Sequence, residues 1–303
     1  MSWLWGKSSE PEPEPAEAAD EEDHHLNEDD VDGELPPEDD DDLAAGGGGG
    51  GGGAAAAEDG DPFNAEEKAI FDRLRARLED MRGDPVAADF LSDDSVMWRY
   101  YTAHADGECP GPEDKVESFL DAAEEMFRGS VAWRNELKID EMWERWLTQS
   151  EAAKKDPWVQ LGRLAFYGQN GVSLNAVSVT GGPITYERLG KVDAKGILKD
   201  EEVRAAVTEA YIMSLESAWR CVRGYGGKTR ATMVLDLKGL GWSFFSNMDF
   251  IKQIAKIGPP NYPEISEKIL AVRAPWILKA IWSMISPLLP KRTREKVGRL
   301  VGW

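Results

Sequence analysis

The sequence predicts an α/β protein in which a small helical module precedes a mostly parallel sheet with helical cover. Three observations support this fold class. Apolar residues recur at helical spacing between residues 64 and 147. Beyond Pro157, short β-prone segments alternate with helical ones, which is typical of parallel sheets. The first 63 residues show neither pattern. We therefore expect a disordered acidic and glycine-rich tail at 1–63, a helical module at 64–150, and a sheet-containing domain at 151–303.

The tail is set apart by its charge. Residues 1–62 hold 21 acidic residues and one basic residue, whereas the remainder of the chain holds 35 and 34. The formal net charge of −21 therefore belongs almost entirely to the tail. Its acids, prolines and the glycine run 46–53 offer too little apolar surface to offset the entropy of ordering the backbone.

The helical module should contain three main helices. The first is predicted from Asn64, a plausible N-cap, to Met81, and Gly83, Asp84 and Pro85 should end it. A second begins at Ser92–Ser95, and a loop follows at 105–112. The third runs from Lys115 to about Leu137, with the module ending near Trp146 or Leu147.

The second part alternates strands and helices. Strands are expected at Val177–Val179, around Ile184–Leu189, at Ala231–Leu237 and at Ile269–Val272; helices are expected from Asp200, at Phe244–Ile257 and at Ala274–Pro290. The segment Ala231–Leu237 is continuously apolar, as in strands buried on both faces. No internal repeat interrupts this order.

Composition excludes several functions. Only His104 lies outside the tail, and the chain has two cysteines, Cys109 and Cys221, so we expect no zinc cluster, other metal site, cofactor or disulfide framework. The near-neutral body argues against nucleic acid as a partner. The start of the chain lacks the features of a secretory signal or transit peptide, and the expected location is the cytoplasm.

Motifs for catalysis are incomplete. Gly227-Lys228-Thr229 resembles the end of a phosphate-binding loop, but Val222 stands where that motif needs glycine, and the segment precedes a strand. Gly241-Trp242-Ser243 lacks the second glycine of a nucleophile elbow. We therefore expect no enzyme activity. The alternative, a small hydrolase or nucleotide-using enzyme, would depend on Ser243 or Lys228.

The segment Ala274–Pro290, APWILKAIWSMISPLLP, is apolar on nearly every face of a helix. Such a helix is either deeply buried or in contact with lipid. With 17 residues, Lys279 inside it and Pro287 near its end, it is short for a membrane span. Helix statistics alone favour a buried core helix, and the surrounding motifs favour a lipid contact.

Four ordered motifs carry a family resemblance: Tyr186–Asp193, Leu235–Gly239, Asn261–Glu264 followed by Lys268–Pro275 and the apolar helix, and Thr293–Lys296. Two stretches of the helical module, Asp93–Ser95 and Ala122–Arg134, add to these motifs. With them, the sequence from about residue 64 to 303 resembles the CRAL-TRIO lipid-binding family, nearest to its phosphatidylinositol/phosphatidylcholine transfer type. The resemblance implies an apolar lipid cavity walled by the sheet and helices. The family pattern normally continues with a further strand and helix, so we expect a C-terminal end that is truncated relative to the family.

The resemblance also assigns site residues. The apolar helix becomes a mobile gate at Ala274–Ile285, and its gate and pocket residues would be Trp276, Ile277, Ile281, Trp282, Met284 and Ile285. Tryptophans suit a membrane interface. Lipid-headgroup residues map to Glu264, Thr293 and Lys296, to His104 at the place of a family arginine, and to Arg99 nearby. A cation, a hydroxyl and a carboxylate suit an inositol phosphate.

Other positions depart from the family. Ala231 and Met233 replace the hydroxyl residues of choline-phosphate binders, Thr185 replaces a tyrosine, and Ile265 follows the headgroup glutamate. The expected function is non-enzymatic binding and transfer of a phospholipid between membranes, with phosphatidylinositol as the candidate lipid. We expect a monomer that contacts membrane surfaces transiently and peripherally. The alternative is a scaffold whose apolar C-terminal helix docks on a membrane or partner without exchanging lipid.

Overall fold

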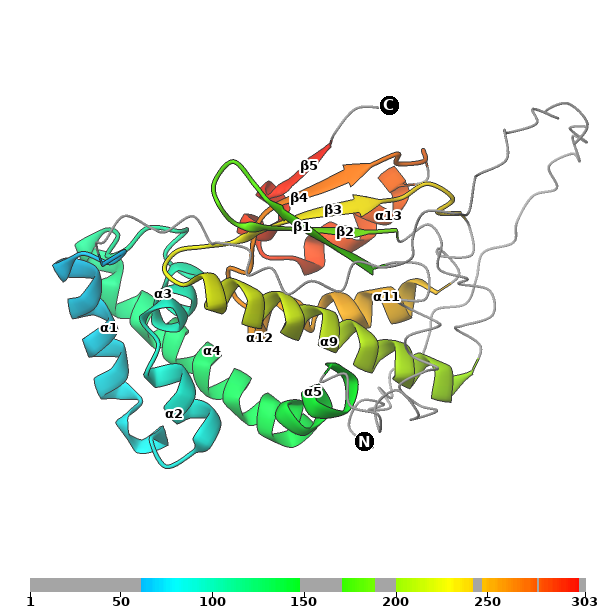
Figure 1. Ribbon diagram of the computed structural model, residues 1–303. Helices are drawn as coiled ribbons and strands as arrows, with labels where there is room; N and C mark the ends of the chain where they lie inside the picture. Colours follow the sequence, from blue (N-terminus) through cyan, green and yellow to red (C-terminus); the bar gives the residue numbers. More distant parts are fainter. Residues whose placement is uncertain (1–60, 148–170, 189–199, 242–246, 277, 300–303) are drawn as a thin grey trace, which may run out of the picture. The chain divides into compact units, whose positions relative to one another are not determined.

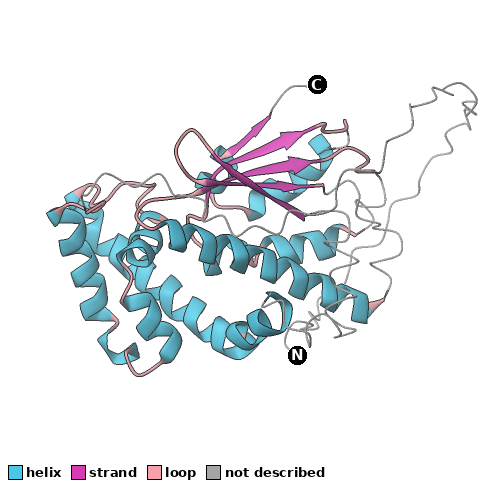
Figure 2. Cartoon of the chain, in the orientation of Figure 1, coloured by secondary structure: helices cyan, strands magenta, loops and turns pink. Residues whose placement is uncertain are grey.

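A computed structural model describes residues 61–147, 171–188, 200–241, 247–276 and 278–299. They fall in one compact unit that spans residues 53–303. Helices come first and a five-stranded sheet follows, as Figures 1 and 2 show. The predicted fold class is thereby confirmed: the protein is α/β, and four of its strands are parallel.

The helical module begins with four α-helices that pack on one another and a fifth that follows them. These elements are α1 (Ala65–Arg77), η2 (Glu79–Met81), α2 (Pro85–Leu91), α3 (Asp94–Thr102), η3 (Glu113–Lys115), α4 (Val116–Leu137) and α5 (Ile139–Leu147). Asn64 caps α1 as predicted, and Glu67 completes a capping box with it. The first helical run ends before Gly83 as expected, but a helix that was not predicted, α2, starts directly afterwards, because Asp84 caps it and proline is well suited to a first helical position.

The sheet has the strand order β1-β2-β3-β4-β5. Its strands are β1 (Gly171–Val177), β2 (Pro183–Glu187), β3 (Ala231–Asp236), β4 (Ser266–Val272) and β5 (Val297–Arg299). β1 pairs antiparallel with β2, and all other neighbours are parallel. The strand predicted at Val177–Val179 was placed too late, since Val177 ends β1 and Val179 lies fully exposed in the following turn.

The second part also contains α9 (Glu201–Tyr225), α11 (Met248–Ala255), α12 (Gly258–Asn261), α13 (Leu278–Ile285), η6 (Ser286–Leu288) and α14 (Lys291–Glu295). Asp200 caps α9 through the main-chain N–H groups of Glu202 and Val203. The apolar helix predicted from Ala274 begins only at Leu278. Arg273 lies in the left-handed region, with a φ of 51°, and Pro275 follows, so the chain turns here and the helix starts only after this turn.

One hydrophobic core joins the module to the sheet. Trp219 of α9 is fully buried, and its ring contacts Phe90 of α2, Tyr100 of α3 and Tyr262 before β4. Ala231, the first residue of β3, belongs to the same cluster. Aromatic side chains dominate this core because each buries a large apolar area. The module and the sheet are therefore held together by shared packing.

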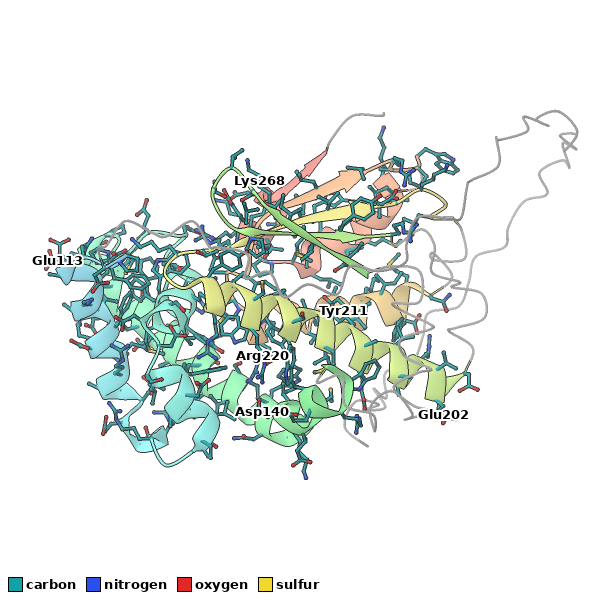
Figure 3. The ribbon with its side chains drawn as sticks, viewed as in Figure 1. Glu113, Asp140, Glu202, Tyr211, Arg220 and Lys268 are labelled. Carbon is teal, nitrogen blue, oxygen red and sulfur yellow. The ribbon has the colours of Figure 1, made fainter. Side chains whose placement is uncertain are left out.

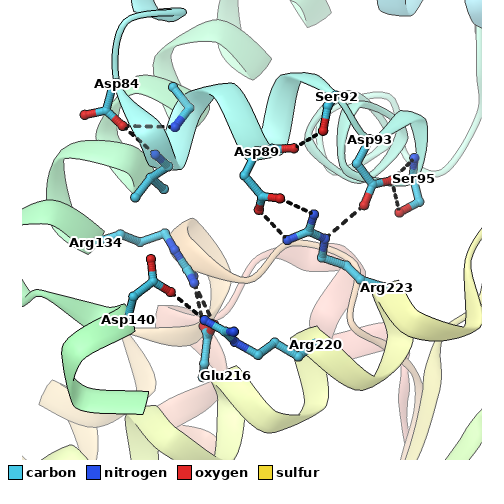
Figure 4. Close-up of polar contacts among 12 residues, drawn as sticks. Asp84, Asp89, Ser92, Asp93, Ser95, Arg134, Asp140, Glu216, Arg220 and Arg223 are labelled. Carbon is cyan, nitrogen blue, oxygen red and sulfur yellow. Dashed lines mark hydrogen bonds and ion pairs between the residues drawn. The ribbon is translucent and has the colours of Figure 1, made fainter. Parts of the chain in front are cut away.

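Buried charges reinforce this junction (Figure 4). Glu216 of α9 has no exposed surface, and both of its oxygens accept from Arg134 of α4 at 2.7 Å. Arg220 also donates to Glu216, at 2.7 Å, and reaches Asp140 of α5 at 2.5 Å. A buried carboxylate needs such partners, because removing one side of a buried pair leaves an uncompensated charge. The network fixes α9 against α4 and α5.

Candidate functional site

Glu264 stands at the centre of a charged cluster at the amino end of β4. It lies in the turn between α12 and β4, with a positive φ of 54° and a relative exposure of 8%. A left-handed backbone is costly for a residue other than glycine, and it persists only where the surroundings impose it. Here Arg99 of α3 imposes it, donating from Nη1 to the Glu264 carbonyl at 2.6 Å.

Three cations surround the Glu264 carboxylate. Lys296 Nζ lies 3.0 Å from Oε1, Arg292 Nε lies 2.8 Å from Oε1, and Arg230 Nη2 lies 2.9 Å from Oε2. Arg230 precedes β3, Arg292 belongs to α14, and Lys296 follows α14. Glu264, Arg230, Arg292 and Lys296 are called the Glu264 cluster below. A single carboxylate cannot neutralise three cations, so the cluster favours a further anion.

The pKa values follow from this crowding. Burial opposes ionisation of Glu264, but Lys296, Arg230 and Arg292 outweigh burial and hold its pKa below the ordinary value. Burial lowers the pKa of Lys296, and the neighbouring arginines add to this effect while Glu264 opposes it. Burial likewise lowers the pKa of Arg230, with Arg292 contributing repulsion. The cations repel one another, and a bound anion would relieve that repulsion.

A cavity of about 400 Å³ opens beside the cluster. It is lined by Arg230, Glu267, Lys268, Leu270, Arg292, Glu295, Lys296 and Gly298. Figure 3 labels Lys268, which projects from the sheet at this place. Pockets of this size are typical of small-molecule sites. The cavity lies against β4, β5 and α14, and none of the described residues that line it belongs to α13.

A loop of the helical module closes over the cluster. Gly107, with a φ of 86°, lies so near Arg292 that a Cβ atom there would stand 1.9 Å from Nη1. A Cβ atom there would force the flexible end of the Arg292 side chain to move, and the positive φ favours glycine. The module therefore contributes both Arg99 beneath the cluster and Gly107 against it.

The other predicted headgroup residues lie at different depths. Thr293 is half-buried on α14, between Arg292 and the end of the helix. His104 is half-buried in the loop after α3, its Nε2 has no hydrogen-bond partner, and burial lowers its pKa. Among the described residues, no hydrogen bond or ion pair joins His104 to Glu264. Arg99 has no exposed surface and donates to the carbonyls of Glu264 and Thr229, so it positions the cluster from beneath.

The predicted gate residues lie on and before α13. Trp276 is 70% exposed, and Trp282, Met284 and Ile285 are half-buried. Met284 and Ile285 pack against a small core of Leu237, Leu240, Met248 and Ala271. Ile277 and the side chain of Ile281 lie outside the described residues. The helix thus rests on the sheet while keeping apolar surface accessible to solvent.

Comparison with known proteins identifies the domain. Residues 173–300 match the family model described as the CRAL/TRIO domain. The chain therefore has a CRAL/TRIO domain. This confirms the resemblance seen in the sequence. The matched region contains most of β1, all of β2 to β5, α13 and the Glu264 cluster, Arg230 included.

Relatives of the CRAL/TRIO domain extend the match. The Sec14 cytosolic factor of Schizosaccharomyces pombe is 26% identical over 77% of this chain and 74% of its own length. The phosphatidylinositol/phosphatidylcholine transfer protein SFH4 of Arabidopsis thaliana is 25% identical over 59% of this chain. A CRAL-TRIO domain-containing protein of Caenorhabditis elegans is 27% identical over 57%. The chain spans only 28% and 23% of the plant and nematode proteins.

The fold of the CRAL/TRIO domain and its module also matches a solved structure. The crystal structure of Sfh5 superimposes with a TM-score of 0.50 over 78% of this chain and 80% of that chain, at 15% identity. This likeness concerns the fold alone. Among the helices that the structure describes, none has both the length and the apolar character needed to cross a bilayer.

Sequence reasoning missed Arg230, Arg292 and Lys268 as parts of the site. A signal for Arg230 was present, because it directly precedes a strand of the CRAL/TRIO domain and Glu264 lies just before another. In the parallel pair β3 and β4, Ala231 N–H donates to the Ile265 carbonyl at 2.7 Å, which brings the two preceding residues together. The signal for Arg292 was its position beside Thr293.

Proposed function

We propose that this chain binds one phospholipid molecule and transfers it between membrane surfaces without altering it chemically. In this proposal the protein works as a monomer in the cytoplasm and meets membranes only transiently. The names of two relatives support it: the fission-yeast protein is called a cytosolic factor, and the plant protein a phosphatidylinositol/phosphatidylcholine transfer protein.

The observation that carries the proposal is the Glu264 cluster beside its cavity. Lys296 and two arginines share one carboxylate there, and their side chains keep between 12% and 20% of their surface exposed. Ammonium and guanidinium groups form strong charge-assisted hydrogen bonds with phosphate oxygens. Phosphatidylinositol fits best among phospholipids, because its hydroxyl groups can donate to Glu264 and bond to Thr293 nearby.

The acyl chains require a different surface. Burying hydrocarbon contributes about 0.8 kcal/mol per CH₂. Keeping the two acyl chains of one lipid out of water is therefore worth on the order of 20 kcal/mol of free energy. We assign α13 as the gate over that shelter. Its apolar residues are only half-buried on the sheet, and Trp276 at its start is mostly exposed. Such a helix can exchange contact with the sheet for contact with a bilayer.

Transfer can be measured with the full chain after removal of bound lipid. Donor vesicles carry fluorescent phosphatidylinositol or phosphatidylcholine, and acceptor vesicles carry neither. We expect uptake of one lipid per chain and delivery to acceptors, faster for phosphatidylinositol. Vesicle binding without any exchange would contradict the proposal and support the scaffold alternative.

Two neighbouring substitutions on α13 test the gate. Met284→Asp places a charge against the core of Leu237 and Ala271 and should reduce transfer at least tenfold. Ser283→Asp changes an exposed position one residue away and serves as the matched control. Both variants are first checked for an unchanged circular dichroism spectrum. Equal transfer by the two variants would remove α13 from the mechanism.

A further inference from the structure

The turn that leads into α13 is tied to a buried carboxylate. Arg273 follows β4 directly, and its guanidinium binds Asp236 of β3 through two nitrogens: Nε lies 2.9 Å from Oδ1, and Nη2 donates to Oδ2. Asp236 is the register partner of Val272, the residue just before Arg273. The ion pair therefore fixes the point at which the chain leaves the sheet and turns toward the helix.

The backbone of Arg273 depends on this ion pair. Its φ of 51° lies in the left-handed region, which is costly for a residue with a long side chain. A contact that holds the side chain in place can maintain such a conformation. Because α13 begins only five residues later, at Leu278, a change of backbone conformation at Arg273 would redirect the helix.

The ion pair and α13 lie on opposite faces of the sheet. Leu235 of β3 and Ala271 of β4 share a small core with Met284 of α13, which lies along the sheet (Figure 1). Successive side chains of a strand point to opposite faces, so Asp236 faces away from that core. Release of Arg273 from Asp236 therefore frees the turn without opening the apolar contacts of the helix directly.

Asp236 keeps other donors when the guanidinium leaves. The Tyr186 hydroxyl donates to Oδ2 at 2.8 Å, and the Lys238 main-chain N–H donates to Oδ1 at 3.1 Å. The cost of leaving a buried carboxylate without its cation is reduced by these bonds. The Arg273 side chain is 52% exposed, so a competing anion can reach its guanidinium from solvent.

A phosphate group of a membrane surface has the chemistry to compete for Arg273. A guanidinium binds phosphate oxygens through two hydrogen bonds, just as it binds a carboxylate. Trp276, three residues further along, is 70% exposed, and tryptophan is favoured at the bilayer interface. Lys238 and Lys279 are also exposed, and basic residues close to a membrane are attracted to anionic lipids.

We propose that Arg273 is a switch between two anions, Asp236 while the protein is in water and a lipid phosphate while it is at an anionic membrane surface. The exchange releases the turn and lets α13 leave the sheet. This inference rests on the proposed function and goes beyond it in naming the residue that couples membrane contact to opening. Because it acts through α13, Arg273 is a positioning residue.

Hydrogen–deuterium exchange of the full chain in water tests the first half of the switch. Arg273→Asn and Asp236→Asn both break the ion pair, and asparagine tolerates the left-handed backbone. Each should raise the exchange rate of the α13 amides about fivefold more than that of the α4 amides. Lys256→Asn, at an exposed position after α11, is the control for Arg273→Asn. An equal rise in both helices, or no rise beyond the control, would overturn the switch.

Vesicles that contain phosphatidylserine test the second half. Asp236→Asn frees the guanidinium and should bind these vesicles about two- to fivefold more tightly than the wild type, whereas Arg273→Asn should bind them about fivefold more weakly. Asp249→Asn, at an exposed position of α11, matches the charge change of Asp236→Asn, and Lys256→Asn matches that of Arg273→Asn. Vesicles of phosphatidylcholine alone should show no such differences. Effects no larger than those of the two controls would overturn the switch.

Neither measurement needs lipid transfer, so the two proposals can fail separately. Both effects in a chain that transfers no lipid would uphold the switch and reject the proposed function. Normal transfer without these effects would reject the switch alone.

Discussion

Arg99 and Glu264 are 165 positions apart, yet Arg99 Nη1 donates to the Glu264 main-chain carbonyl at 2.6 Å. The same guanidinium donates through Nη2 to the Thr229 carbonyl. It thereby joins the residues that precede β3 and β4 and holds Arg230 opposite the Glu264 carboxylate. A side chain of the helical module thus sets the geometry of a site built by the sheet domain.

Loss of this guanidinium should destabilise the whole protein. Arg99→Met leaves the buried Glu264 carbonyl and the partly buried Thr229 carbonyl without this donor, and we expect a loss of about 3 kcal/mol in the free energy of unfolding. Urea denaturation followed by tryptophan fluorescence measures it. Arg73→Met, which removes only an exposed ion pair with Glu117, should cost less than about 1 kcal/mol. Similar losses in the two variants would contradict the role given to Arg99.

Replacement of the Glu264 carboxylate should make the stability of the folded protein depend on bound anions. Glu264→Gln leaves Lys296, Arg230 and Arg292 without their shared counter-charge, and the free energy of unfolding should fall by about 2 to 4 kcal/mol. A bound anion restores the missing charge and stabilises the folded state through binding linkage. Added inositol phosphate should therefore raise the melting temperature of the variant more than that of the wild type. An equal rise in both would show that the cluster does not bind the anion.

Glu187 should make stability fall as pH rises. It ends β2 opposite Leu235, and burial raises its pKa to about 7 from an ordinary value of 4.5. Between pH 4.5 and 7 the unfolded chain releases this proton while the folded chain keeps it, so the wild type loses stability over that range. Glu187→Gln cannot titrate. It should match the wild type near pH 4 and exceed it by about 1 to 3 kcal/mol at pH 8.

The test for Glu187 is a pair of urea denaturation series from pH 4 to pH 8. A stability difference that stays constant with pH would show that the carboxyl titrates normally.

Asp236 should act in the opposite direction at low pH. Burial opposes its ionisation, but hydrogen bonds from Arg273 and the Tyr186 hydroxyl outweigh burial and lower its pKa to about 2 from 3.8. The stability that this ionised carboxylate provides is complete above pH 3.8 and is lost as the pH falls toward 2. Arg273→Asn keeps a residue that tolerates the left-handed backbone and removes the guanidinium.

This variant should show a higher midpoint of acid unfolding than the wild type, measured by circular dichroism between pH 5 and 2. Lys256→Asn, at an exposed position after α11, controls for the loss of one positive charge. An unchanged midpoint in Arg273→Asn would mean that Arg273 does not stabilise the carboxylate.

Local signals in the sequence predicted much of the fold. The N-caps Asn64 and Asp200 and the apolar segment of β3 gave the correct helix starts and strand, because each depends on neighbouring residues. The pairing of Glu264 with Lys296 could only be suggested by the family resemblance. The short strand β5 gave no signal, since three residues are too few for a periodic pattern.

The rest of the site depends on contacts between distant segments. Arg99 looked like a headgroup residue because its sequence neighbourhood matched the family, and nothing in the sequence shows that it is buried. The role of Gly107 is equally hidden, because it depends on how closely Arg292 approaches from the far end of the chain. Tertiary contacts of this kind follow from the packing of the whole domain.

The shared aromatic core has a practical consequence for anyone who shortens this chain. A fragment limited to residues 173–300, the extent of the family match, would retain Trp219 and Tyr262. It would lose Phe90 and Tyr100, which contact Trp219, and Trp133, which contacts Tyr262. The exposed rings of Trp219 and Tyr262 would promote precipitation. Binding assays on such a fragment would then measure a misassembled particle, and a negative result would say nothing about lipid.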